Sequence, residues 1–514
     1  MKHKKILSAV LAACMLAGSS IASLPASAEN GDTGILPYES YREYGDVNLD
    51  LSVDVADAVV IARFYAMDYT LQITDLGKQL GDVNLDGNLD DDDLKQVLEY
   101  IAHKRTRLGV ADNPVEHLYQ AVNLTEQTES GTATGKEADE AFISSQMKLT
   151  VDLFRKAAAD QQSEGKDVLI SPLSVSQALA MTANGADGET KTEMEKLLGD
   201  TIDIDTLNQY YYDYTERLTG GENPALHLAN SLWVNNDEKR IKVPQTFLQT
   251  TKDYYHAEAF STPFDDSTVK DVNNWVNFYT HEMIPKLLEK CNPDWVMMLV
   301  NALAFEAEWS EPYERMNIRD NTFHAYDGDM TVEMMSSEES RYISDENAVG
   351  FIKPYKGGQY SFAAVLPNEN MTVSQYVDAM TPESLQKLLS SATNDTVYAR
   401  LPKFSHDYTL VMNDILQNLG MKKAFADADF SRLTSVGNPN IDMVLHKTFI
   451  QVDERGTKAG AVTAVMVMEC AVEEPPQPKY VFLDRPFIYM ILDRKTNLPV
   501  FIGYVLHPTA VEAE

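Results

Sequence analysis

The sequence predicts an α+β domain that follows a small all-α module, and three observations lead to this prediction. After residue 139, helix-like apolar patterns come first and strand-like patterns come later, which is typical of an α+β domain. Before residue 139, two Asp-rich segments repeat, and each leads into a helix with one apolar face. The chain has 514 residues, more than one average domain, and its apolar fraction of 44% permits a large core.

Residues 1–28 have the pattern of a secretory signal peptide. Lysines precede an apolar stretch from Ile6 to about Ala22, and Ala26-Ser27-Ala28 fits a small-residue cleavage site. We therefore expect a secreted, extracellular protein. One alternative stays open, because Leu11-Ala12-Ala13-Cys14 resembles a lipoprotein cleavage box. Cleavage there would make Cys14 a lipid-anchored N-terminus and attach the protein to a membrane.

Charge and cysteine content exclude several classes of partner. The net charge of −35 argues against binding to nucleic acid or to an anionic membrane surface. Only Cys291 and Cys470 remain after cleavage at Ala28, so the secreted chain is not a disulfide scaffold. The sequence has no His-Glu-x-x-His, Gly-x-Ser-x-Gly or Walker motif, and we do not expect an enzyme.

Two Asp-rich loops repeat at a spacing of 36 residues, beginning at Asp46 and at Asp82. Each places oxygen side chains at loop positions 1, 3, 5, 9 and 12, with position 7 able to offer a backbone carbonyl. Two copies are hard to explain as acidic turns with chance spacing, and we expect two calcium ions. The predicted ligands are Asp46, Asn48, Asp50, Ser52, Asp54 and Asp57 in the first loop, and Asp82, Asn84, Asp86, Asn88, Asp90 and Asp93 in the second.

A helix with one apolar face is predicted after each loop. Leu94, Val97, Leu98 and Ile101 follow the second loop at helical spacing, and Ala58 begins the equivalent row after the first. Over residues 41–106 this pair of loops and helices resembles a type I dockerin. The resemblance implies a calcium-dependent bond to a cohesin on a scaffold protein, in the cell-surface cellulosome of a bacterium.

The module departs from the usual dockerin pattern in two ways. Leu51 stands where a Gly is usual at the sharp turn, and a positive φ there costs a non-Gly residue about 1–2 kcal/mol. The first calcium site is therefore expected to be weaker or differently bent. Dockerins use loop positions 10 and 11 in choosing a cohesin, and these differ between the repeats, so the cohesin class stays open. The implied cohesin contacts are Val55, Ala56, Asp91 and Asp92.

Residues 107–138 are predicted to be a linker, and residues 139–510 the large domain. The stretch from Thr125 to Gly135 is rich in Thr, Glu, Gly and Ser and has no apolar period, which is typical of a flexible tether. In the large domain we expect an early helix with an apolar face formed by Phe142, Met147, Val151, Leu153 and Phe154. Strands are expected at Tyr360–Leu366, Phe449–Asp453 and Phe487–Leu492.

The segment from Asp453 to Phe487 carries the most functional information. Every second residue from Thr457 to Val467 is small or β-branched, and none of them is charged. In a strand these residues share one face, which could enter a crowded sheet. Three glutamates and three prolines follow, which suits an exposed loop. A segment that fits both states indicates a switch, with an ordinary β-hairpin and a Pro-rich turn as the alternative.

The large domain resembles the serpins, a family of serine-protease inhibitors. The resemblance rests on blocks in the family's order, which together span the domain. They are Ile170–Val175, Gly185–Thr190, Asn230–Val234, Leu299–Phe305, Leu401–Phe404, Leu419–Met421, Phe482–Tyr489 and Phe501–Val505. The resemblance implies helices around a large central sheet with an exposed reactive loop.

By position, the resemblance assigns roles to residues in three regions. Ser171, Ser174, Asn301 and His446 match the shutter, a polar cluster beneath the central sheet, although His446 could equally be an ordinary core histidine. Trp309 matches the aromatic residue at the top of the sheet, where insertion begins. The implied hinge of the reactive loop contains Glu454, Gly456, Thr457, Ala459 and Ala461. No Pro and no inward charge interrupts the hinge, and it has the pattern of an inhibitory serpin.

The family's usual spacing from Glu454 places the reactive bond at Cys470–Ala471, with Met468–Glu469 as the second choice. A small, fairly apolar Cys470 suits a subtilisin-like, elastase-like or chymotrypsin-like protease, or a papain-like one. Cys470 could also be a plain exposed thiol among acidic residues. Two other functions stay open: a non-inhibitory serpin acting as a binding or structural component, and a dockerin-bearing carbohydrate-active enzyme.

Overall fold

The computed structural model describes residues 44–48, 53, 55–65, 71, 73–84, 88–101, 108, 119–126, 128, 131–160, 163–220, 225–280, 283–437, 439–457 and 477–509. The signal peptide predicted at residues 1–28 lies outside them. In the described part of the chain, no helix is both long and apolar enough to cross a membrane.

The N-terminal module contains three helices among its described residues. They are α2 (Val55–Tyr65), α3 (Asp75–Gly81) and α4 (Asp91–Ile101). Ala58 and Ile61 of α2 pack with Leu94 and Val97 of α4 in a small core of their own. The helices predicted after both Asp-rich loops are therefore present, and their apolar faces meet each other.

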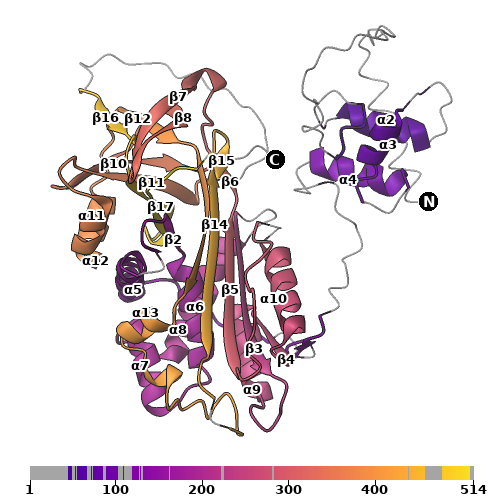
Figure 1. Cartoon of the computed structure of the whole chain (residues 1–514), viewed down its shortest axis with the longest axis vertical. Helices are drawn as coiled ribbons and strands as arrows, with labels where there is room; N and C mark the ends of the chain where they lie inside the picture. The colour runs from indigo at the N-terminus through magenta and orange to yellow at the C-terminus, as the bar shows by residue number, and fades with distance from the viewer. Residues whose placement is uncertain are drawn as a thin grey trace.

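The large domain is built around an eight-stranded sheet with the order β1-β4-β3-β5-β14-β15-β6, and β13 pairs with β14. Its strands are β1 (Val122–Asn123), β3 (Leu226–Asn235), β4 (Glu258–Thr262), β5 (Met297–Phe305), β6 (Ala307–Glu308), β13 (Phe404–Val411), β14 (Met443–Val452) and β15 (Gly456–Thr457). Figure 1 shows β5 and β14 side by side along the length of this domain. The strand predicted at Phe449–Asp453 is the last part of the longer β14.

Both faces of the central strand β5 are covered. Leu299 and Leu303 belong to the main core, whereas Met298 and Val300 on the opposite face join a second core with Trp275 of α10 (Asp266–Tyr279). Because successive strand residues point to opposite faces, burial on both sides requires an unbroken apolar run. Every residue of β5 is buried, and the single amide within it, Asn301, needs a polar partner.

Two further sheets complete the domain. A six-stranded sheet has the order β2-β18-β17-β11-β10-β9, and a four-stranded sheet has the order β16-β12-β8-β7. The six strands are β2 (Val168–Ile170), β9 (Tyr342–Ser344), β10 (Ala348–Pro354), β11 (Tyr360–Pro367), β17 (Phe487–Asp493) and β18 (Pro499–Val505). The four are β7 (Ile318–Ala325), β8 (Gly328–Glu339), β12 (Val397–Pro402) and β16 (Lys479–Phe482). The strands predicted at Tyr360–Leu366 and Phe487–Leu492 are β11 and β17.

Helices surround these sheets. They are α5 (Glu140–Ala158), α6 (Pro172–Ala183), α7 (Gly188–Gly199), α8 (Ile204–Thr219), α9 (Gln245–Tyr255), α10 (Asp266–Tyr279), α11 (Val373–Ala379), α12 (Pro382–Ser390) and α13 (Asn413–Asn418), with 3-10 turns η2 (Arg315–Asn317) and η3 (Lys423–Phe425). The early helix predicted from its apolar face is α5, which buries Phe142, Leu153 and Phe154. Helices then dominate the first part of the domain and strands the second, so the α+β prediction is confirmed.

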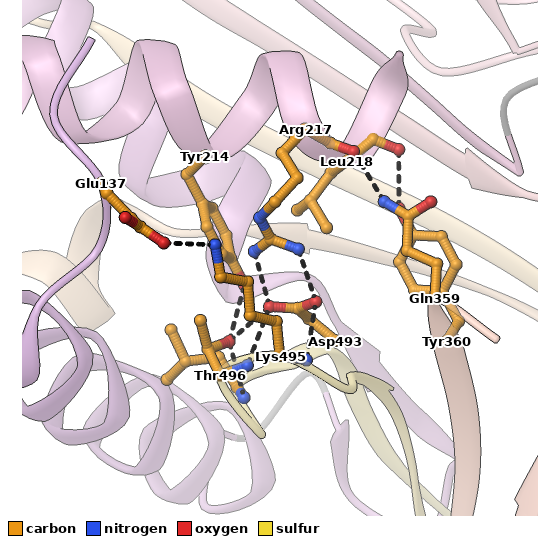
Figure 2. A network of polar contacts seen from close by, with 10 residues as sticks. Glu137, Tyr214, Arg217, Leu218, Gln359, Tyr360, Asp493, Lys495 and Thr496 are labelled. Carbon is orange, nitrogen blue, oxygen red and sulfur yellow. Dashed lines mark hydrogen bonds and ion pairs between the residues drawn. The ribbon is translucent and has the colours of Figure 1, made fainter. Parts of the chain in front are cut away.

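A bidentate ion pair fixes helix α8 to the six-stranded sheet (Figure 2). Arg217 donates to both carboxylate oxygens of the fully buried Asp493, at 2.8 and 2.7 Å. The Thr496 hydroxyl donates to the same carboxylate at 2.5 Å. Burial alone would raise the pKa of Asp493, but the hydrogen bonds from Arg217 and Thr496 lower it below its ordinary value. The exposed pair Lys495–Glu137, at 2.5 Å, lies beside this cluster.

The linker prediction for residues 107–138 needs a correction. Val122 pairs antiparallel with Ser261, and β1 thereby forms an edge of the eight-stranded sheet. The Ala121 N–H donates to the buried carboxylate of Asp271 at 2.7 Å. A polar composition predicts a tether, but the backbone of any segment can pair with an open sheet edge that the fold supplies. Described residues from Tyr119 onward are therefore packed on the large domain.

Candidate functional site

The start of the informative segment lies between two strands of the central sheet. Strand β15 consists of Gly456 and Thr457, and Thr457 pairs antiparallel with Val452 of β14 on one side. On the other side, Thr457 pairs with Ala307 and Gly456 pairs with Glu308, both of β6. The segment therefore enters the sheet with two residues and is flanked on both sides there.

Beyond this entry point the sheet is closed. Strands β5 and β14 pair directly and in parallel, from Met298↔Met443 to Leu303↔Thr448, and these six pairs leave no place for another strand. Residues 458–476 lie outside the described residues. This range includes the predicted hinge residues Ala459 and Ala461, and both predicted reactive bonds, Cys470–Ala471 and Met468–Glu469.

Gly456 is required by the close approach of the neighbouring strand. A Cβ atom at this position would overlap the carbonyl oxygen of Ala307. The turn that delivers Gly456 is held by Asp453, whose carboxylate accepts from the N–H groups of Arg455 at 2.8 Å and Gly456 at 3.1 Å. Burial raises the pKa of Asp453, and these two hydrogen bonds oppose that shift. Local sequence thus shapes the entry of the segment into the sheet.

Trp309 holds the residues just before β15 in place through two hydrogen bonds. Its indole N–H donates to the carbonyl of Asp453 at 2.9 Å, and its backbone N–H donates to the carbonyl of Arg455 at 2.8 Å. The indole stacks on the buried ring of Tyr355, with centroids 4.5 Å apart and planes 11° apart. The Tyr355 hydroxyl lies 2.6 Å from that of Thr457, whose side chain is 1% exposed. The row of alternate residues that starts at Thr457 therefore begins on the inner face of the sheet.

Ion pairs surround this entry point. Lys403 contacts Glu454 at 2.8 Å and Glu333 at 3.2 Å. Burial favours a lower pKa for Lys403, but these carboxylates raise the pKa above its ordinary value. Deeper in the protein, Lys353 and Glu339 form a pair at 2.8 Å in which both side chains are buried. Lys403 thus links Glu454, just before β15, to Glu333 of β8, and the buried pair links β10 to β8.

The four predicted shutter residues, far apart in the sequence, meet in one buried network. Ser171 caps helix α6 by accepting from the Ser174 N–H at 3.2 Å, and Pro172 occupies the first helical position. The Ser174 hydroxyl donates to the side-chain carbonyl of Asn301. Asn301 and His446 are directly paired residues of β5 and β14, and the His446 Nδ1 lies 3.1 Å from the Asn301 Oδ1.

The hydrogen bonds fix the protonation state of His446. Its Nε2 lies 3.1 Å from the backbone N–H of Ser171, which can only donate, so Nε2 accepts. The proton of a neutral ring is then on Nδ1, facing the acceptor oxygen of Asn301. Complete burial lowers the pKa of His446 from 6.5 to about 3, and the ring is neutral at physiological pH.

The structure extends the network to residues that sequence reasoning missed. The Asn301 amide donates to Asn230 of β3 at 2.5 Å, and the Asn230 amide donates to Gln177 of α6 at 3.2 Å. Asn230 lies directly opposite Asn301 in the strand register. No sequence signal set Asn230 apart, because β3 also contains the polar residues His227, Ser231 and Asn235. The network therefore crosses three adjacent strands of the sheet, β3, β5 and β14.

In the N-terminal module, the last acidic residue of each predicted calcium loop lies in an equivalent position. Asp57 accepts from the N–H groups of Val47 at 2.8 Å and Asn48 at 3.0 Å. Asp93 accepts from those of Val83 at 2.9 Å and Asn84 at 3.3 Å. Asp46, Asp57 and Asp93 are all buried, and burial raises the pKa of Asp93 to about 6. A divalent cation bound in each loop would offset the cost of these buried carboxylates, and hard oxygen donors suit calcium.

The calcium ligands are only partly within the described residues. Asp50, Ser52, Asp54 and Asp86 lie outside them. Among the residues that are described, no three acidic, His or Cys side chains are assembled closely enough to hold a metal ion. The predicted cohesin contacts Val55, Asp91 and Asp92 are exposed at the first turns of α2 and α4, where Ala56 also lies.

Comparison with known proteins identifies the large domain. A family model described as "Serpin (serine protease inhibitor)" matches residues 144–508. An uncharacterized serpin-like protein of Thermococcus kodakarensis is 30% identical over 366 residues, covering 70% of this chain and 84% of that relative. An alpha-1-antiproteinase of Rattus norvegicus is 28% identical over 361 residues, covering 68% and 85%.

Solved structures give the same result. The native state of tengpin, a thermophilic serpin, is 46% identical, with a TM-score of 0.70, and covers 76% of this chain and 100% of its own. The latent state of tengpin is also 46% identical and has a TM-score of 0.64, covering 73% and 100%.

The fold and these relatives place the protein in a class of protease inhibitors rather than enzymes, which confirms that prediction. Within that class, the chain belongs to the serpin family. The match spans nearly all of the large domain, so no part of that domain is left to support the carbohydrate-active alternative.

Proposed function

We propose that the protein is a secreted suicide-type inhibitor that traps a serine or cysteine protease, and that a dockerin holds it on a bacterial cellulosome. One observation carries the first half of the proposal. Strand β15 enters the central sheet with two residues, while β5 and β14 remain paired beyond it. A loop that already starts inside the sheet needs only the separation of that pairing to continue as a full strand.

The covalent step takes place on the loop. With a serine protease, the protease hydroxyl oxygen attacks the carbonyl carbon of Cys470, and the bond to the Ala471 nitrogen breaks. The hydroxyl proton ends on the new amino group of Ala471, and Cys470 remains as an ester of the protease serine. Insertion of the cut loop then carries the bound protease along the sheet and distorts its active site before water hydrolyses the ester.

Residues of the site have defined tasks in this step. The side chain of Thr457 on Tyr355 sets which alternate residues enter the core, and those up to Val467 are small or β-branched. Separation of β5 from β14 breaks the contact between Asn301 and His446. Because both groups have other partners in the network, each keeps a hydrogen bond when that contact is lost, and the cost of opening is modest.

A gel assay against subtilisin, pancreatic elastase, chymotrypsin and papain tests this half. A band stable in SDS at the summed mass of chain and protease is expected, and mass spectrometry of the released C-terminal fragment should show Ala471 as its first residue. A fragment beginning at Glu469 would move the reactive bond to Met468–Glu469. Cleavage near Cys470 without any stable band would favour the non-inhibitory alternative, a serpin acting as a binding or structural component.

The docking half of the proposal rests on the two repeated Asp-rich loops and on the helices that follow them. Calorimetry on the full chain should detect two calcium ions, with one lost in each of the variants Asp57→Ala and Asp93→Ala. Asp152→Ala, on the surface of α5, serves as the control and should change neither site. Pull-down with immobilised type I cohesins should require calcium. Calcium binding without capture by any of the cohesins would contradict the docking role.

A further inference from the structure

An exposed aromatic surface lies beside the strand that follows the reactive loop. Strand β16 pairs in parallel with β12, which places Tyr480 beside Tyr398 and Phe482 beside Arg400. Tyr398 is 41% exposed and Tyr480 60% exposed, whereas Val397, Ala399 and Val481, which alternate with them, are buried. We call the outward side chains Tyr398, Arg400, Tyr480 and Phe482 the tyrosine face.

The side chains of the tyrosine face hold one another in place. The ring centroids of Tyr398 and Tyr480 are 5.6 Å apart. Those of Tyr480 and Phe482 are 5.9 Å apart in an edge-to-face arrangement. The Arg400 guanidinium lies 4.2 Å from the centroid of the Phe482 ring. Side chains that are already ordered lose little conformational entropy when a partner covers them. Tyr and Arg are also the residues that most often dominate the energy of protein interfaces.

The position of the tyrosine face in the chain identifies the partner that can cover it. Lys479 begins β16 eight residues after Ala471, and a fully extended chain of that length reaches at most about 28 Å. A globular protease of about 250 residues has a radius of gyration near 18 Å, and so is roughly 45 Å across. A protease bound at the reactive bond is therefore wider than the longest possible distance between that bond and Lys479. The surface of the protease can then contact β16.

The predicted reactive residue gives a reason for a second contact. A small side chain such as Cys470 offers the pocket of a protease little to read, because differences of one or two small groups discriminate weakly. A further surface of interaction can supply the missing selectivity by stabilising the encounter with one protease over others that cut the same loop. Two cations, Arg400 and Lys479, lie on these strands of an acidic protein, and the exposed Glu338 of β8 lies opposite Tyr398.

We propose that the tyrosine face is a second contact surface for the target protease, outside the protease's substrate pocket, and that it sets the rate of association. This proposal rests on the proposed inhibitory function. It concerns the step before the acyl-enzyme forms, and leaves the covalent chemistry and loop insertion unchanged.

The test replaces both exposed rings. In the full chain, Tyr398→Thr with Tyr480→Thr keeps β-branched hydroxyl residues in the strands but removes the aromatic surface. The control is Tyr326→Thr, because Tyr326 is 69% exposed on the turn after β7, at the opposite edge of the same sheet. Equal unfolding temperatures of variant and wild type exclude a folding defect, and the single substitutions replace the pair if it unfolds.

Two measurements separate docking from trapping. The first is the second-order rate of complex formation with whichever of subtilisin, elastase, chymotrypsin and papain the wild type traps fastest. The second is the dissociation constant for each of these proteases with its catalytic Ser or Cys replaced by Ala. The double variant is expected to associate 10- to 100-fold more slowly and to bind correspondingly more weakly, with the same number of inhibitor molecules consumed per protease. Tyr326→Thr should stay within twofold of wild type.

Each other outcome has a definite meaning. Equal rates and affinities for wild type and double variant overturn the proposal, as does an equal loss in Tyr326→Thr. Failure of the wild type to bind any inactivated protease also overturns it, even if the gel shows trapping. If no protease is trapped, the proposed inhibitory function fails, but binding to the inactivated proteases still decides whether the tyrosine face docks them.

Discussion

At the scale of single residues, His446 links two strands, β5 and β14, that would separate in the proposed insertion. It accepts from Ser171 and faces Asn301 across the pairing of β14 with β5. A second proton would place a charge in a fully buried site and an N–H on Nε2 against the N–H of Ser171. The neutral form of this one ring is therefore a condition for the closed sheet.

Acid is expected to weaken the native protein through this ring. The pKa of His446 is about 3 in the folded protein and near 6.5 when the chain is unfolded, so the unfolded state binds the proton more tightly. Stability is then highest above pH 6.5 and falls as the pH drops below it, by about 2 kcal/mol at pH 5. Urea denaturation between pH 7.5 and pH 5 measures the slope, and His446→Gln should have a smaller one. Equal slopes in the two proteins would show that groups other than His446 cause the acid sensitivity.

Thr457 decides what can enter the sheet. Its side chain is buried against Tyr355, and Thr457→Arg would bring an unpaired charge to that place, at a cost of several kcal/mol. Protease still cuts this variant, but the SDS-stable complex should fall at least tenfold, because the ester is hydrolysed before the loop inserts. Thr457→Ser keeps the hydroxyl and should trap normally. Undiminished trapping by Thr457→Arg would contradict the inward placement.

At the scale of elements, helix α8 is fixed by a contact whose strength depends on burial. Asp493 is fully buried and bound in bidentate geometry by Arg217, whereas the neighbouring pair Lys495–Glu137 is exposed. Water screens the exposed pair, but a buried carboxylate without its partner has no such relief.

Arg217→Met should therefore destabilise the protein by roughly 3–5 kcal/mol, and Lys495→Met by less than about 1 kcal/mol. Adding Asp493→Asn to Arg217→Met should restore part of the loss, since the buried charge is then gone. Denaturant titrations of the single and double variants complete the cycle. Additive losses would mean that the pair contributes little beyond its separate side chains.

The sequence predicted elements better than it predicted their partners. The helical spacing of Phe142, Leu153 and Phe154 identified α5 because a surface helix buries one apolar face whatever the fold around it. Asn230 was missed, because its role depends on lying opposite Asn301, and strand register is not visible in one sequence. The two-residue β1 was read as a tether for the same reason. The shutter residues were assigned by resemblance, and the structure brings them together.

At the scale of the whole molecule, the proposed mechanism gives the large domain one more strand than its sheet contains. The central strands β5 and β14 are paired with each other at the place that an inserted strand would take. The TM-score to native tengpin is 0.70 and exceeds the TM-score to latent tengpin, 0.64. A strand inserted between β5 and β14 would pair with both in place of their single direct pairing, so the sheet would gain hydrogen bonds on balance and bury an additional apolar row.

Loop cleavage should therefore raise thermal stability, opposite to the usual effect of a cut chain. We expect the unfolding temperature of the cleaved protein to rise by roughly 10 °C or more, as several additional kcal/mol would produce in a domain of this size. Differential scanning calorimetry before and after limited proteolysis measures the change. Cleaved Thr457→Arg is the control and should gain little. A wild-type chain that gains nothing would show that the loop does not insert.

The two residues of β15 that already lie in the sheet also affect how long an uncut molecule stays able to inhibit. An intact chain contains the same strand-forming residues as a cut one. Only the energy barrier to separating β5 from β14 therefore prevents the uncut loop from inserting. Its working lifetime is then a half-life, set by a rate that rises several-fold for every 10 °C of warming. At a higher temperature the protein must be replaced more often in order to keep the same number of molecules able to insert their loop.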